Sequence, residues 1–182
     1  MNTVQEYLDW LDQISGSKGK IYDIGGKELL PQIFVAIYDQ IPELEHKTAY
    51  SFGLSSVPHE EWRSGRPELV ISVRSSDDSW GLAMGEIIKE KRDAHLFEYG
   101  SVFNFGERIS DESEMSAFLV FANSLFDPGD ERAVFSDRTI SLSQLYPIYA
   151  EEWETIHQIG AEAFYFEREI DFFDVRRKRV LK

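Results

Sequence analysis

Residues 50–55 read Tyr-Ser-Phe-Gly-Leu-Ser, and residues 68–73 read Glu-Leu-Val-Ile-Ser-Val. The first stretch is typical of a strand that runs into a glycine turn, because glycine adopts turn conformations that other residues avoid. In the second stretch apolar side chains occupy alternate positions, which predicts a strand with one strongly apolar face. The apolar run at residues 33–38 predicts another strand, and it can pair with residues 47–52 as a hairpin.

Helical periodicity surrounds these strands. Residues 3–15 predict an amphipathic helix, and a second helix is expected from about Ser79, capped by Asp77 or Asp78 and directing Trp80 inward. Further strands are expected at 102–105, 118–121 and 140–143. Pro147 suits the first turn of a helix that directs Trp153 and Ile156 inward, and residues 161–170 read as helical again.

Hairpins interspersed with a few helices favour the α+β class: a mixed, largely antiparallel sheet packed with several helices. The length, 182 residues, is that of a single domain spanning 1–182. It has an N-terminal helix within residues 1–16 and a basic tail at 176–182, which is expected to be frayed or to form a terminal strand.

Composition and charge limit the kinds of site and the classes of partner that the chain can have. The chain has no cysteine, which excludes disulfides and thiolate metal sites, and a net charge of −14. The start lacks the pattern of a signal peptide, and we expect a cytoplasmic protein without a membrane span. Such a charge repels phosphate backbones and anionic lipid, so we expect neither a nucleic acid nor a membrane as partner. It serves solubility or steering toward a basic protein partner.

Motifs for catalysis or cofactor binding are not found. Neither a phosphate-binding loop nor a dinucleotide fingerprint occurs, and the four histidines are scattered. Ser55 lies in a Gly-Leu-Ser-Ser-Val stretch that resembles a nucleophile elbow but lacks its second glycine. The acidic clusters at 111–114 and 127–131 do not follow the order of calcium ligands. Glu151, Glu152 and Glu154 offer an acid/base pair, but their place in the first turns of a helix already explains them electrostatically. We therefore expect no catalytic residue, no cofactor and no metal.

A polar loop supplies the candidate partner-binding residues Trp62, Arg63 and Arg66. Tryptophan and arginine are enriched in the energetic centres of protein interfaces. The alternative is that Trp62 folds back as a lid on the core.

Taken together, these motifs resemble the suppressor-of-fused-like family, in its bacterial single-domain form. The resemblance covers about residues 33–170: the 50–55 turn, the 68–73 strand, and Leu-Tyr-Pro-Ile at 145–148 leading into Glu152 and Trp153. It implies a mixed α/β domain without established catalytic residues. Animal members are signalling repressors that clamp an extended peptide of a transcription factor, whereas bacterial relatives include immunity proteins that neutralise a toxin. The chain lacks the extra C-terminal lobe of the animal form, which is part of the two-lobed peptide clamp. No peptide-binding residue is carried over, because the matching motifs are structural ones.

Three functional hypotheses follow. The first is a non-catalytic intracellular protein-binding module, an immunity protein that neutralises a basic toxin domain. The second is a regulator that sequesters a peptide by strand addition, which an exposed edge strand would support. The third is a small hydrolase that uses Ser55 or an acidic pair, which a pocket of converging reactive groups would support.

Overall fold

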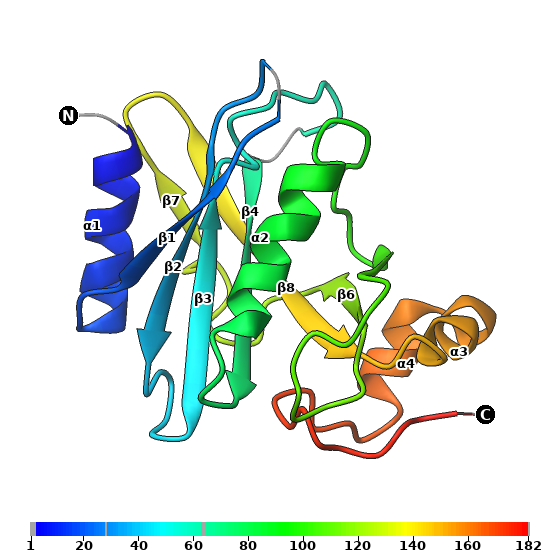
Figure 1. Ribbon diagram of the computed structural model, residues 1–182. Coiled ribbons are helices and arrows are strands. Elements are labelled where there is room, and N and C mark those ends of the chain that lie inside the picture. Colours follow the sequence, from blue (N-terminus) through cyan, green and yellow to red (C-terminus); the bar gives the residue numbers. More distant parts are fainter. Residues whose placement is uncertain (1–2, 28, 63–64, 182) are drawn as a thin grey trace.

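The computed structural model describes residues 3–27, 29–62 and 65–181. Within them, one eight-stranded sheet runs in the order β1-β2-β3-β4-β8-β6-β5, with β7 paired to β8 (Figure 1). The strands are β1 (Lys20–Gly25), β2 (Ile33–Asp39), β3 (His46–Phe52), β4 (Arg66–Arg74), β5 (Val102–Asn104), β6 (Ala117–Phe121), β7 (Arg132–Val134) and β8 (Thr139–Ile148). The β4–β8 pair is parallel and the other described pairs are antiparallel, which confirms the predicted fold class.

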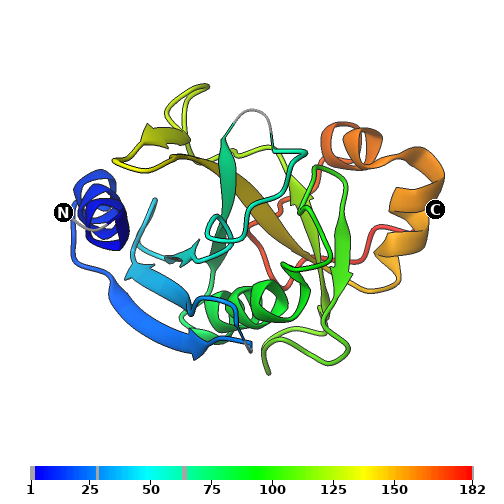
Figure 2. The ribbon, with the colours of Figure 1, turned by 90° about the horizontal axis from the view of Figure 1, so that it is seen from above.

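Helices cover both faces of the sheet (Figure 2). The helices are α1 (Thr3–Ser15), α2 (Ser79–Lys91), α3 (Glu152–Ile159) and α4 (Ala161–Phe166). Alternate residues of β4 face opposite layers: Leu69 packs in the core beneath α2, while Val70 packs in the core beneath α1. In the same way Tyr146 of β8 faces α3 and α4. The predicted helix at 3–15, the hairpin and the helix from Ser79 with buried Trp80 all occur.

Two expectations near the end of the chain are wrong. Pro147 lies in β8 opposite Phe118, and α3 begins five residues later at Glu152. β4 pairs with β8 only as far as Gln144. No described strand therefore pairs with that side of β8 around Pro147, and a missing amide donor is tolerated there. The basic tail forms neither a frayed end nor a strand: residues 176–181 are described, run without regular structure and bury Arg177.

A buried carboxylate joins the two stretches that decide the fold. The side chain of Glu68 in β4 has no solvent exposure. The hydroxyl groups of Ser51 and Ser55 donate to it at 2.6 and 2.7 Å. The backbone N–H groups of Gly53 and Ser55 donate at 2.8 and 3.0 Å. The Tyr-Ser-Phe-Gly-Leu-Ser turn thus wraps around the first residue of the next motif, and four donors replace the water that a carboxylate loses on burial.

Gly53 is the residue that permits this turn. Its φ is +123°, and a Cβ atom there would lie 2.5 Å from the carbonyl oxygen of Gln32. The carbonyl of Gly53 accepts from the guanidinium of Arg92 at 2.7 Å, and that guanidinium also donates to the carbonyl of Pro31. Arg92 follows α2 and is fully buried. A positive and a negative side chain are therefore buried on either side of the same glycine, tying α2 to β3 and β4.

We predict that Glu68→Gln lowers the free energy of unfolding by about 3 kcal/mol, because an amide NH2 group replaces one of the two acceptor oxygens and leaves buried donors of the 50–55 turn without a partner. Urea unfolding followed by tryptophan fluorescence measures the change. Glu114→Gln, which removes an exposed carboxylate paired with Arg179, is the matched control and should cost less than about 1 kcal/mol. Equal effects of the two substitutions would contradict a central role for Glu68.

Candidate functional site

Among the described residues, no strand pairs with the outer side of β5, the last strand of the sheet. The N–H of Val120 in β6 donates to the carbonyl of Ser101 at 2.9 Å, and the N–H of Phe105 donates to Ser116 at 2.8 Å. Bonding alternates along an antiparallel strand, so the backbone groups of Val102 and Asn104 face away from β6. The described strands include none beyond β5, which lies between α2 and the α3–α4 pair (Figure 2).

On one side of this edge, exposed aromatic side chains surround a hollow. Trp153 of α3 is 54% exposed and Tyr99 is 59% exposed, and both line this hollow. Val102 and Trp153 together line two adjoining hollows of about 470 and 240 Å³. The sequence placed Trp153 in the core, and this expectation is wrong. Its ring instead stacks on His157 at 5.6 Å with an angle of 15° between the planes.

A buried ion pair fixes the helix that carries Trp153. Glu152, its neighbour, receives two hydrogen bonds of 2.6 and 2.7 Å from the guanidinium of Arg177. The amides of Tyr149 and Val180 also donate to this carboxylate, at 3.1 and 2.8 Å. Both side chains are almost completely buried. Because Glu152 faces inward, Trp153 is directed outward, next to β5.

On the other side of β5 one cationic side chain, that of Lys91, lines the surface. A hollow of about 410 Å³ is lined by Ile87 and Lys91 of α2, by His95, and by residues 101–104. The ring of His95 meets that of Phe103 edge to face at 5.7 Å. None of the carboxylates in the described part of the chain lines this hollow or the two beside Trp153. Although the chain has a net charge of −14, the described hollows beside β5 thus have no acidic side chain in their lining.

The opposite edge of the sheet is protected. A bulge interrupts the pairing of β1 between Asp23 and Gly25, and Lys20 and Asp23 place charges along the strand. Bulges and edge charges are features that discourage the pairing of another strand. β5 is therefore the edge that is better suited to pairing.

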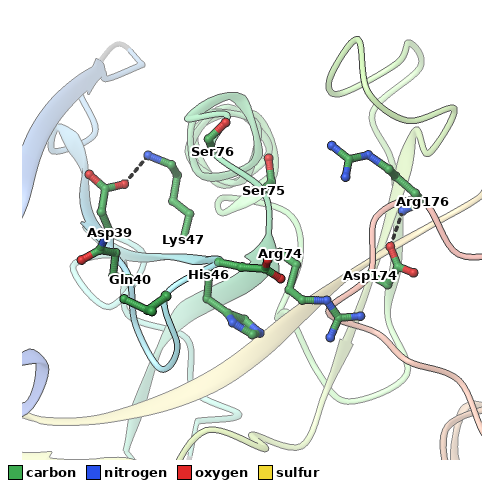
Figure 3. Close-up of a pocket in the computed structure, with 11 residues that line it drawn as sticks. Asp39, Gln40, His46, Lys47, Arg74, Ser75, Ser76, Asp174 and Arg176 are labelled. Carbon is green, nitrogen blue, oxygen red and sulfur yellow. Dashed lines mark hydrogen bonds and ion pairs between the residues drawn. The ribbon is translucent and has the colours of Figure 1, made fainter.

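A further hollow, of about 710 Å³, lies at the end of the β2–β3 hairpin (Figure 3). Its cations are already paired: Lys47 with Asp39 and Asp78, Arg74 with Asp171, and Arg176 with Glu112. Partial burial raises the pKa of Asp78, but hydrogen bonds from Lys47, Tyr22 and Lys20 outweigh it and hold that pKa at about 2. This hollow therefore presents charges that the fold itself satisfies.

The candidate residues from the polar loop occupy different settings. Trp62 is half-buried, packs against the core beneath α2 and donates to the carbonyl of Leu96 at 3.3 Å. Arg66 begins β4 and donates to the carbonyl of Ser55 at 3.1 Å. Arg63 lies outside the described residues. A partner-binding role for these three residues stays a prediction.

Ser55, the candidate nucleophile, is fully buried, and its hydroxyl donates to Glu68. It therefore lies beyond the reach of a substrate. Among the described residues, no three histidine or acidic side chains gather as they would around a metal ion. No helix in the described ranges combines the length and hydropathy needed to cross a bilayer.

Comparison with known proteins identifies the family. The family model for Suppressor of fused protein (SUFU) matches residues 30–178. The chain belongs to the suppressor of fused family. The match confirms the resemblance first seen at residues 33–170. A search of curated proteins gives no match.

Solved suppressor of fused structures share the fold. A homologue from Neisseria gonorrhoeae FA 1090 is 18% identical with a TM-score of 0.76, and the alignment covers 99% of this chain and 98% of that one. Drosophila Suppressor of Fused is 15% identical with a TM-score of 0.69, covering 97% and 51%. A chain of the Sufu–Fu complex is 16% identical with a TM-score of 0.69, covering 99% and 91%. The chain thus spans about half of the Drosophila protein.

We predict that Arg177→Met destabilises the protein by about 3–5 kcal/mol, because it leaves the buried carboxylate of Glu152 without its positively charged partner. Adding Glu152→Gln should recover part of that loss, since the uncompensated charge is then gone. Arg176→Met is the matched control: its guanidinium pairs with Glu112 but is mostly exposed, so the cost should stay below about 1 kcal/mol. Chemical denaturation measures all three, and a double variant no more stable than Arg177→Met would refute the buried-charge explanation.

Proposed function

We propose that this chain is a non-catalytic protein-binding module that takes up an extended segment of a partner protein along β5. The observation that carries the proposal is the unpaired backbone of Val102 and Asn104, set between two lined hollows. An added strand gains main-chain hydrogen bonds from such an edge, and its alternate side chains enter the hollows on the two sides. The solved Sufu–Fu complex supports the proposal, because a relative of this fold there forms a complex with another protein.

Exposed aromatic groups add to this support. Trp153 and Tyr99 present large apolar surfaces to solvent beside the edge, and tryptophan and tyrosine are the residues that most often dominate binding energy at interfaces. The buried pair Glu152–Arg177 holds the helix that carries Trp153, so the surface is preorganised and less ordering entropy is lost on binding.

Backbone methylation of a bound peptide tests strand addition without changing the protein. Binders are first selected from a displayed library of random peptides of about ten residues, enough for one strand. The tightest is then resynthesised with one amide N-methylated at a time. Affinity should fall about tenfold or more at every second residue, where the N–H faces β5, and little at the residues between. Fluorescence anisotropy provides the readout.

An equal loss of affinity at all positions, or at none, would contradict strand addition, as would a library that yields no binder. On the protein side, Val102→Pro removes the outward amide while the bonded residues Ser101 and Phe105 stay unchanged. It should weaken the same peptide. Circular dichroism confirms that the variant is folded.

The charge of the chain favours a second candidate, an immunity protein that neutralises a basic toxin domain in the cytoplasm. The net charge is −14, and three cations of the basic tail are engaged with acidic side chains of the fold. An acidic protein attracts a basic enzyme over long range and blocks its substrate from entering.

Salt dependence tests this candidate. The association rate with a basic toxin domain encoded beside this chain should fall markedly between about 50 mM and about 150 mM salt, as the screening length shortens. Stopped-flow fluorescence measures the rate. A rate that does not change with salt would remove the electrostatic basis of the immunity role, while leaving strand addition along β5 unaffected.

A further inference from the structure

The two sides of the β5 edge differ in chemistry, and this difference restricts what can bind there. We infer that the segment taken up along β5 alternates an apolar or aromatic side chain, directed toward Trp153, with an acidic side chain, directed toward Lys91 and His95. The inference rests on the proposed strand addition and specifies the chemistry of the partner segment.

Strand geometry imposes the alternation. Successive side chains of a strand point to opposite faces of a sheet. Within β5 itself, Val102 packs with the core beneath α3 and α4, while Phe103 packs with the core beneath α2. A strand added beside β5 continues the same two faces. One of its side chains therefore meets the Trp153 hollow and the next meets the hollow of Lys91 and His95.

The face of α3 selects an apolar side chain. The smaller hollow on this face is the more apolar one and is lined by Val102, Asn104, Ala117, Ala150 and Trp153. The larger one shares Val102 and Trp153 and is also lined by Tyr99, Gly100, Ser101, Ile156, His157 and Ala161. A partner side chain that enters here removes aromatic and aliphatic surface from water, which stabilises the complex by roughly 25 cal/mol per Å² of apolar area.

The face of α2 selects an acidic side chain. Lys91 is exposed, and no ion pair of its ammonium group occurs among the described residues. The acids near it along the chain have other cations: Glu90 and Asp93 pair with Lys27, and Glu86 pairs with Lys89. Lys91 thus keeps its charge available at the edge of a strongly acidic molecule.

A charge exchange between protein and peptide tests the inference. Random peptides of about ten residues are selected against the native chain and, separately, against Lys91→Glu. Peptides that bind the native chain should carry Asp or Glu at one position, with aromatic or aliphatic residues on both sides of it. N-methylation of one amide at a time defines which peptide residues face β5 and so fixes that position. Lys91→Glu should weaken these peptides about tenfold and select Lys or Arg at the same position, while the apolar positions persist.

The control makes the same change of charge elsewhere. Arg132 lies on β7, which pairs with the start of β8, whereas β6 pairs with the end of β8. Arg132→Glu should alter neither the affinity for the peptides nor their selection. Trp153→Ala should remove the apolar preference alone. Peptides that show the alternating methylation effect but are indifferent to Lys91→Glu would overturn this inference and leave strand addition intact. Peptides without the alternating effect, or the absence of any binder, would overturn both.

Discussion

The carboxylate of Glu68 is the interaction on which the sheet depends. It is buried where β3 turns toward β4, and the donors that satisfy it belong to one short turn. A buried carboxylate without these partners would lose its hydration with nothing to replace it. The turn must therefore close in one conformation, with Gly53 at positive φ and Arg92 on its carbonyl. β4, α2 and the β3 turn are fixed together by this one requirement.

A second buried pair plays the same part at the other end of the sheet. Glu152 and Arg177 bring the last residues of the chain back to the start of α3. The two buried carboxylates thus organise two parts of the molecule. Glu68 organises the part that contains β1–β4 and α2, and Glu152 organises the part that contains β5, β6 and α3. Between α2 and α3 lies β5, whose outer backbone no described strand completes. The fold therefore supports its free edge from both sides.

The net charge of the chain and the side chains at the β5 edge act on a partner at different distances. Over long distances the charge of −14 attracts a basic protein. At contact distance the β5 edge presents Lys91, His95 and aromatic groups, with no carboxylate in the described lining. A partner that is basic as a whole but offers an acidic and apolar strand satisfies both. Long-range charge governs the association rate, whereas the local contacts govern dissociation.

The sequence alone determined the fold class, the hairpin and the inward position of Trp80 on α2, because hydrophobic periodicity is a local signal. The motifs at 50–55, 68–73 and 145–148 carried the resemblance to the family. The sequence did not reveal that Glu68 satisfies the turn at 50–55, or that Pro147 lies within a strand. The periodicity of the helix that contains Trp153 predicts an inward side chain. In the structure Arg177, 25 residues after Glu152, binds the carboxylate of Glu152 in the interior, and Trp153 therefore faces outward. Only the tertiary structure decided the surface beside β5, because burial and charge pairing there depend on residues far apart in the chain.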